Sequence, residues 1–166
     1  MSIVRSIEPL DVAVIGASLT GLFAAAAAAE SGHRVTLLER DRLADAPVGR
    51  QGVPQGEQPH IFLLRGLLAA DQLLPGLRAE LALQGAVPFD TGRLAWLGEQ
   101  GWAPVRSSGF EVISLTRPLF EQVVRRRVLA LDGVLLRDDC RVRELSRRES
   151  SGTGAPRWRA GGVRQR

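Results

Sequence analysis

The sequence predicts an α/β fold with a parallel sheet, and three observations within the first 40 residues predict it. A short β-branched block, "DVAVI", ends at a glycine, which is typical of a buried strand followed by a sharp turn. An alanine-rich block, "GLFAAAAAAE", then has the composition of a helix. A third block, "RVTLL", is again β-branched and apolar. Strand, helix and strand in this order form a βαβ unit, in which the two strands are parallel.

The elements of this unit have clear limits in the sequence. The helix ends at Ser31-Gly32, because glycine readily adopts the left-handed conformation of a helix C-cap. His33 follows in the turn and is expected to be exposed. The bounds that we predict are a fully buried strand at 10–15, a helix from Leu19 or Thr20 to Ala29, and a second buried strand at 35–38.

The rest of the chain alternates between loops, helices and short strands. Residues 41–59 are rich in proline, glycine and charge and predict a long loop. "RLAWL" and "WAPV", separated by "GEQG", predict a small antiparallel hairpin with a four-residue loop. Thr116 is predicted to cap a helix that carries Pro118 in its first turn. The remaining predictions are helices at 60–74, at 77–83 and from Thr116 to about residue 131, and strands at 134–136 and 141–145.

Composition and charge are those of a soluble domain with a basic tail. Apolar residues make up 45% of the chain and charged residues 24%. Residues 1–110 carry a net charge of −2 and residues 111–166 one of +6, and all 22 cationic side chains are arginine. After Ser146 the apolar pattern stops, so we expect one domain at 1–145 and a disordered Arg-rich tail at 146–166.

The sequence gives limited information about binding partners and cellular location. The tail shows no helix-turn-helix or RNA-binding signature, so no nucleic-acid partner is expected. Cys140 is the single cysteine and cannot form an internal disulfide, which is compatible with a cytoplasmic location. The oligomeric state is not predicted.

Residues 12–29 carry no charge and are the one segment that could be interpreted as a membrane span. Two glycines, a serine and a threonine interrupt the apolar run, and Asp11 and Glu30 border it. We therefore favour a strand followed by a helix and expect no membrane partner. A small protein anchored in the membrane by residues 12–29 remains the alternative.

The turn between the first strand and the helix carries an incomplete glycine pattern. A dinucleotide-binding turn has the form G-x-G-x-x-G, and here Gly16 and Gly21 bracket Ser18 at the middle position. Gly16 allows the sharp turn and Gly21 a close approach of helix to strand, while Ser18 stays small and adds a hydroxyl. The peptide N–H groups that open the helix, at Leu19 and Thr20, would face an anionic pyrophosphate. The pattern predicts a Rossmann-like FAD/NAD(P)-binding βαβ domain.

Glu39 ends the second strand, 18 residues after Gly21. An acid at this place in a βαβ unit accepts hydrogen bonds from the hydroxyls of the adenosine ribose. It also repels a 2′-phosphate, so FAD or NAD is preferred to NADP, although the neighbouring cation of Arg40 weakens that preference. Glu39 and Arg40 therefore join the predicted cofactor-binding residues.

Four segments share the pattern of one enzyme family. They are "VIGASLTGL" (14–22), "LLERDRL" (37–43), "RQGVPQGEQPHIFLLRG" (50–66) and "LTRPLFEQVVRRRVLALDGV" (115–134). Together they resemble the FAD-dependent oxidoreductases related to aromatic-ring hydroxylases, flavin monooxygenases of the 2-polyprenylphenol hydroxylase type. The resemblance implies FAD as cofactor, with NAD(P)H as co-substrate and an organic small molecule as substrate of the complete enzyme.

The resemblance also implies roles for residues further along the chain. Arg50 and Arg117 would lie along the pyrophosphate and ribityl chain of FAD, and Gln55 and His60 would line the flavin. We assign His60 no catalytic role, because the preceding "EQP" departs from the family pattern. No residue is expected to act as a catalytic acid, base or nucleophile or to bind a metal, since the flavin carries the chemistry.

Later motifs of the family do not follow residue 145. Members of the family continue with an Asp-Gly motif, a Gly-Asp motif and a sheet that covers the substrate. We therefore expect an incomplete, amino-terminal part of a flavin monooxygenase, shortened by a frameshift, a premature stop or a fragmentary gene model. Its parallel sheet would have an exposed edge. The alternative function is a non-catalytic module that binds FAD or NAD without turnover.

Overall fold

The structure is a computed structural model that describes residues 8–50, 53, 56, 58–148 and 157–161. The chain divides into two compact units, and each is described by itself. The first unit contains residues 1–45 and 125–166, and the second contains residues 46–124. The boundary at residues 124 and 125 falls inside one helix.

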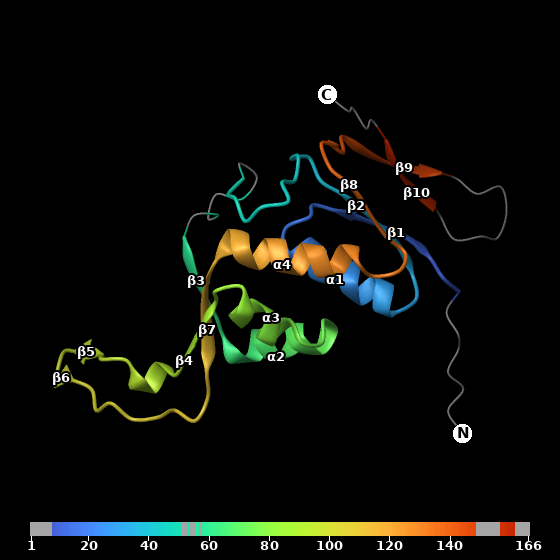
Figure 1. Cartoon of the computed structure of the whole chain (residues 1–166). Helices are drawn as coiled ribbons and strands as arrows, with labels where there is room; N and C mark the ends of the chain where they lie inside the picture. The colour runs from blue at the N-terminus through green and yellow to red at the C-terminus, as the bar shows by residue number, and fades with distance from the viewer. Residues whose placement is uncertain (1–7, 51–52, 54–55, 57, 149–156, 162–166) are drawn as a thin grey trace, which may run out of the picture. The chain divides into compact units, whose positions relative to one another are not determined.

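The first unit is built on a three-stranded parallel sheet with the strand order β1-β2-β8. One helix, α1, crosses from β1 to β2 and packs on the sheet through Leu22, Ala25 and Ala26, which are buried (Figure 1). The predicted α/β fold with a βαβ unit is confirmed. The bounds are β1 Asp11–Ile15, α1 Leu19–Glu30, β2 Arg34–Leu38 and β8 Val134–Arg137.

β1 is less buried than the sequence predicts. Leu10 is 54% exposed and Ile15 is 55% exposed, whereas Val35 and Leu37 of β2 are fully buried. β1 pairs with β2 on one side only, so it is an edge strand of the described sheet. The prediction of a fully buried strand is therefore wrong for β1 and correct for most of β2, and the expected exposed sheet edge is present.

The second unit contains a three-stranded antiparallel sheet with the order β3-β7-β4, and two short helices. The rings of Phe62, on β3, and Phe120 pack in a tilted arrangement, with centroids 4.6 Å apart and 50° between the ring planes. The bounds are β3 Pro59–Phe62, α2 Leu64–Leu73, α3 Leu77–Leu83, β4 Val87–Phe89 and β7 Val112–Thr116.

The helix predicted at 60–74 begins later than expected. Residues 59–62 form β3, which pairs with β7, and the helix α2 starts at Leu64. A short apolar run such as "HIF" fits a strand as well as a helix, and pairing with β7 decides between them. The helix predicted at 77–83 is confirmed as α3.

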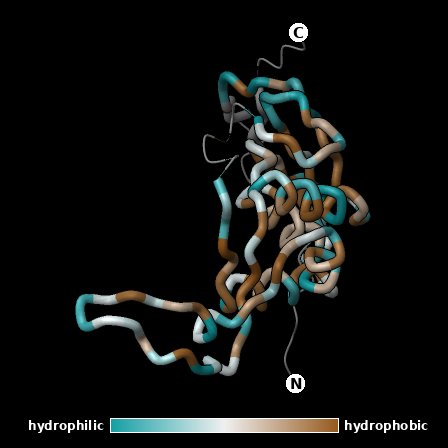
Figure 2. The backbone as a smooth tube through the Cα atoms, turned by 60° about the vertical axis from the view of Figure 1, so that its left-hand side comes forward, coloured by the Kyte–Doolittle hydropathy of each residue, from teal (hydrophilic) through white to brown (hydrophobic). Residues whose placement is uncertain are grey.

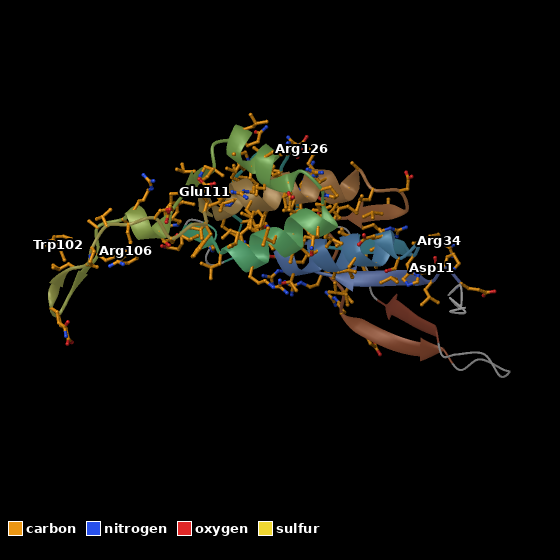
Figure 3. All side chains as sticks on the ribbon, turned by 90° about the horizontal axis from the view of Figure 1, so that it is seen from below. Asp11, Arg34, Trp102, Arg106, Glu111 and Arg126 are labelled. Atoms are coloured by element: carbon orange, nitrogen blue, oxygen red, sulfur yellow. The ribbon has the colours of Figure 1, made fainter. Side chains whose placement is uncertain are left out.

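Residues 90–111 form a long excursion between β4 and β7, which we call the arm. The arm projects away from both strands, and Trp102 and Arg106 lie on it (Figures 2 and 3). It carries a short 3-10 helix at Thr91–Arg93 and a hairpin of β5 (Leu97–Gly98) and β6 (Gly101–Trp102). The predicted hairpin is confirmed, but its loop has two residues, because Gly98 pairs with Gly101.

The helix α4 covers Arg117–Leu129 and follows β7 directly. The Leu119 N–H donates to Thr116 Oγ1 at 3.4 Å, so Thr116 caps the helix as predicted. In the first unit, two further strands, β9 (Glu144–Arg148) and β10 (Arg157–Gly161), pair antiparallel. β10 and the end of β9 lie within 146–166, the segment that the sequence predicts to be a tail.

Candidate functional site

The turn after β1 has the conformation that its glycine predicts. Gly16 has a φ of +97°, in the left-handed region that favours glycine. Its N–H donates to the carbonyl of Leu38 at 2.8 Å, which continues the pairing of β1 with β2 into the turn. A side chain at Gly16 would meet no atom within 4 Å, so the space beside the turn is open in the described structure.

Gly21 allows α1 to approach this turn closely. A Cβ placed on Gly21 would lie 1.8 Å from the carbonyl oxygen of Gly16, which is far inside van der Waals contact. Ser18 is the N-cap residue, and the first turn of α1 contains no acidic residue. The opening peptide N–H groups of a helix carry partial positive charge and have no carbonyl partner within the helix. This end of α1 is thus suited to an anion.

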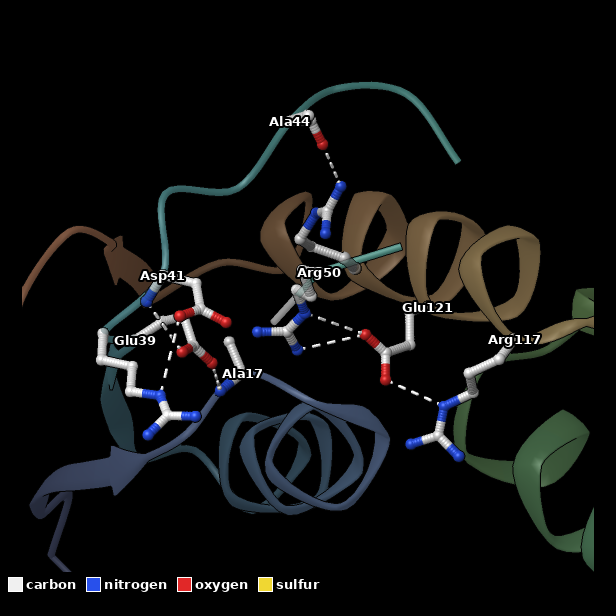
Figure 4. Close-up of polar contacts among 9 residues, drawn as sticks. Ala17, Glu39, Asp41, Ala44, Arg50, Arg117 and Glu121 are labelled. Carbon is white, nitrogen blue, oxygen red and sulfur yellow. Dashed lines mark hydrogen bonds and ion pairs between the residues drawn. The ribbon is translucent and has the colours of Figure 1, made fainter. Parts of the chain in front are cut away.

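Glu39 lies at the same end of the sheet as the glycine turn. Its carboxylate accepts hydrogen bonds from two peptide nitrogens: Oε2 from Ala17 at 2.8 Å and Oε1 from Asp41 at 3.1 Å (Figure 4). Glu39 is only 5% exposed. The sequence predicts that Glu39 and the turn meet a common ligand, and the structure places them in direct contact.

Arg40, the next residue, is in a different environment. Its side chain is 54% exposed and lies beside Asp41, with 3.6 Å between Nε and Oδ1. In the loop that follows Arg40, the carbonyl of Ala44 accepts a hydrogen bond from Arg125 of α4. Arg40 is therefore a surface cation next to Glu39.

In the second unit, Arg50 and Arg117 meet at one carboxylate. Glu121 Oε2 accepts from Nε and Nη2 of Arg50 at 3.3 and 3.1 Å, and Oε1 accepts from Nε of Arg117 at 2.9 Å (Figure 4). The side chains are 12%, 19% and 7% exposed for Arg50, Arg117 and Glu121. The sequence predicts a role in the site for both arginines but not for Glu121. The available signal was the i,i+4 spacing of Arg117 and Glu121 on one helix.

The other residues singled out from the sequence have simpler surroundings. His60 lies on β3 with Nδ1 2.7 Å from the carbonyl oxygen of Gln58, and Gln55 lies outside the described residues. His33 is half-buried, and its Nδ1 accepts from the Leu10 N–H at 3.4 Å, so it is less exposed than expected. Cys140 is buried. Within the described ranges, no group of three His, Cys, Asp or Glu side chains could hold a metal ion.

Residues 12–29 do not form a continuous helix, because β1, the turn and α1 divide them. No helix in the part of the chain that the structure describes is both long and apolar enough to span a membrane. The alternative of a single span at 12–29 is therefore wrong.

Comparison with known proteins identifies the family of this chain. The sequence pattern of the family described as FAD dependent oxidoreductase (DAO) matches residues 11–102, which include β1, the glycine turn, α1, Glu39 and Arg50. The chain belongs to the FAD-dependent oxidoreductase family. The resemblance identified from the sequence is thereby confirmed at the level of this family.

This FAD-dependent oxidoreductase chain also has a curated relative. It is 38% identical over 136 residues to Protein Rv3254 of Mycobacterium tuberculosis, a match that covers 76% of this chain and 28% of the relative. The chain therefore spans less than a third of the length of that protein.

Several solved structures with the same fold are monooxygenases or oxygenases. PqsL of P. aeruginosa in complex with 2-aminobenzoylacetate matches with a TM-score of 0.65 at 17% identity, over 92% of this chain and 40% of that chain. The tetrameric form of 2-methyl-3-hydroxypyridine-5-carboxylic acid oxygenase matches with a TM-score of 0.60 at 20% identity, over 96% and 38%. The p-nitrophenol 4-monooxygenase PnpA of Pseudomonas putida DLL-E4 matches with a TM-score of 0.58 at 18% identity, over 92% of this chain and 38% of that chain. At these identities the likeness shows the shared fold.

Proposed function

We propose that the first unit binds the ADP half of FAD. The turn from Gly16 through Ser18 and Leu19 to Thr20 would surround the pyrophosphate, and Glu39 would accept hydrogen bonds from the ribose hydroxyls. The observation that carries this proposal is the 2.8 Å contact between Glu39 Oε2 and the peptide nitrogen of Ala17. It supports a ribose site and a phosphate site within a few ångströms of each other, as one dinucleotide requires.

The chemistry of the turn supports an anionic ligand there. The positive end of the α1 dipole, the absence of acidic residues from its first turn and the open space beside Gly16 all favour a phosphate group. Ser18 keeps the middle position of the glycine pattern small. Its hydroxyl would donate to a phosphate oxygen.

Glu39 and Arg40 would set the choice of nucleotide. The Glu39 carboxylate repels a 2′-phosphate on the adenosine ribose, which favours FAD or NAD over NADP. Arg40, exposed beside Asp41, would contact the cofactor from the solvent side as a cation.

Arg50 and Arg117 are proposed as further FAD-binding residues, along the pyrophosphate and ribityl chain. The support from the structure is that both guanidinium groups are largely buried and that a shared carboxylate orients them. Oriented guanidinium groups recognise phosphate and hydroxyl oxygens well, because their donors lie in a fixed plane.

For the complete enzyme we propose oxygenation of an organic small molecule in the cytoplasm, with NAD(P)H as reductant. The flavin supplies the redox chemistry with O₂, and the residues of this chain bind it, orient it and limit the access of water. The fold shared with the three oxygenases supports this proposal. None of the residues described above is assigned a proton-transfer step.

A flavin titration of the purified chain tests the proposal. We expect one FAD per chain, seen as a yellow protein with quenched flavin fluorescence, and no comparable binding of NADP⁺. A chain that stays colourless and leaves flavin fluorescence unchanged at saturating FAD would contradict it. Oxidation of NADH in the presence of O₂ then separates an enzyme from a module that binds FAD without turnover.

A further inference from the structure

We propose that Glu39 positions the glycine turn itself, so that it controls binding of the phosphate half of the cofactor as well as the ribose. The inference rests on the proposed function of the first unit and adds a second role to one of its residues. Sugar recognition needs only that the carboxylate reach the ribose. The structure shows a carboxylate that is already bonded to the turn.

The carboxylate is well placed to hold the turn. Oε2 accepts from Ala17 N at 2.8 Å, and Ala17 is fully buried. Oε1 accepts from Asp41 N at 3.1 Å, which orients the side chain from the other oxygen. A hydrogen bond from a buried peptide N–H to a charged acceptor is among the stronger ones in proteins.

The backbone of Glu39 is anchored independently of its side chain. Its N–H donates to the carbonyl of Arg137 at 2.9 Å, and its carbonyl accepts from Cys140 N at 2.8 Å. The Gly16 N–H is bonded to Leu38 at 2.8 Å. The turn is therefore held at two places: Gly16 bonds to the last residue of β2 through the backbone, and Ala17 bonds to the side chain of Glu39, the residue directly after β2.

This contact is compatible with ribose binding by the same carboxylate. Each carboxylate oxygen has two lone-pair positions, so Oε2 can hold the Ala17 N–H and accept from a ribose hydroxyl. The opposite arrangement would be a latch, in which the bond to Ala17 must break before the dinucleotide enters. The two arrangements predict opposite effects on a ligand that has phosphates but no ribose hydroxyls.

A thermodynamic cycle separates these cases. The ligands are FAD and an FAD analogue whose adenosine ribose lacks both hydroxyls, and the proteins are the wild type and Glu39→Gln. Glutamine offers one acceptor oxygen in place of two, so at least one of the bonds to Ala17 and Asp41 is lost. We expect Glu39→Gln to raise the dissociation constant of the analogue about tenfold, since the turn loses a charge-assisted hydrogen bond. An unchanged dissociation constant for the analogue would overturn the proposal, and tighter binding would identify a latch.

Controls keep this measurement interpretable. Glu30→Gln makes the same chemical change at the exposed carboxyl end of α1 and should leave both dissociation constants unchanged. Glu39→Asp keeps the charge but withdraws it from Ala17 and Asp41. Glu39→Asp should weaken binding of the analogue as Glu39→Gln does. It also takes the place of Glu39→Gln if that variant does not fold.

A second measurement needs no ligand. Hydrogen exchange of the Ala17 amide should be about tenfold faster in Glu39→Gln or Glu39→Asp than in the wild type, while amides of α1 such as Leu22 keep their rates. Equal exchange of Ala17 in all three proteins would overturn the role in the turn. If the wild-type chain bound no FAD, the proposed function would fail, and the exchange rates would still decide whether Glu39 holds the turn.

Discussion

The glycine turn of the first unit and the arm of the second are both glycine-containing connections, the first short and the second long, and they are held in different ways. The turn is fixed by a buried carboxylate, a strand pair and a helix packed at contact distance. The arm carries large apolar side chains that remain exposed: Trp96, Leu97, Trp102, Val105 and Phe110.

At its base, the arm is held by polar contacts instead. Asp90 accepts from the Gly92 N–H at 2.8 Å, from Ser107 Oγ at 2.7 Å and from Ser108 N at 3.0 Å. Hydroxyl donation by Ser108 and then Ser107 holds the pKa of Asp90 well below its usual range. An apolar residue thus belongs to a core only where another element packs on it.

The largest expected effect comes from adding one methyl group to each region. In Gly21→Ala the new Cβ would lie 1.8 Å from the Gly16 oxygen, and in Gly92→Ala it would lie 2.3 Å from the Arg106 oxygen. We expect Gly21→Ala to lower the free energy of unfolding by about 2–3 kcal/mol, because packed elements must separate. The arm can shift into solvent, so Gly92→Ala should cost about 1 kcal/mol or less.

Urea unfolding followed by circular dichroism measures both variants, with Ala27→Ser at an exposed position of α1 as the control. Equal losses of unfolding free energy in Gly21→Ala and Gly92→Ala would contradict the contrast between a tightly packed turn and an arm that can shift into solvent.

Removal of a carboxylate should have a smaller effect, and one that again depends on burial. Glu121→Ala leaves two largely buried guanidinium groups without their shared acceptor, so we expect a loss of about 2 kcal/mol in unfolding free energy. Glu111→Ala breaks the ion pair between Arg78 and Glu111, the last residue of the arm before β7. Because these side chains are 39% and 52% exposed, respectively, the change should lower the free energy of unfolding by only about 0.5 kcal/mol. Urea unfolding measures both variants, and a Glu121→Ala variant as stable as Glu111→Ala would show that the buried cluster stabilises the chain no more than the exposed pair does.

The smallest effect is a pH dependence confined to the arm. Because the pKa of Asp90 is lower in the folded chain than in the unfolded chain, its stabilising contribution is complete above the unfolded value and is lost as the pH falls toward the folded one. We expect the base of the arm to loosen below about pH 4, near the ordinary pKa of an aspartate. Tryptophan emission reports this, since Trp96 and Trp102 lie on the arm. In Asp90→Asn, that acid transition should be absent.

Local patterns predicted much of the first unit and of its candidate site. The strand, turn, helix and strand from Asp11 to Leu38 follow from residue composition over a few positions, and Gly16 has the positive φ expected for its turn. The prediction failed where contacts with distant parts of the chain determine burial or strand pairing. Ile15 is exposed because β1 is an edge strand, and residues 59–62 are a strand because β7 pairs with them.

The sequence by itself determined the βαβ unit, the glycine turn and the presence of an acid after the second strand, because strand and helix preferences act between neighbouring residues. Only the tertiary structure decided that Glu39 bonds to Ala17 and that Glu121 joins Arg50 to Arg117. The Glu39–Ala17 and Glu121–Arg50 contacts join residues 22 and 71 positions apart in the chain. A hydrogen bond depends on distance and direction in space, and at such separations these are known only once the chain has folded.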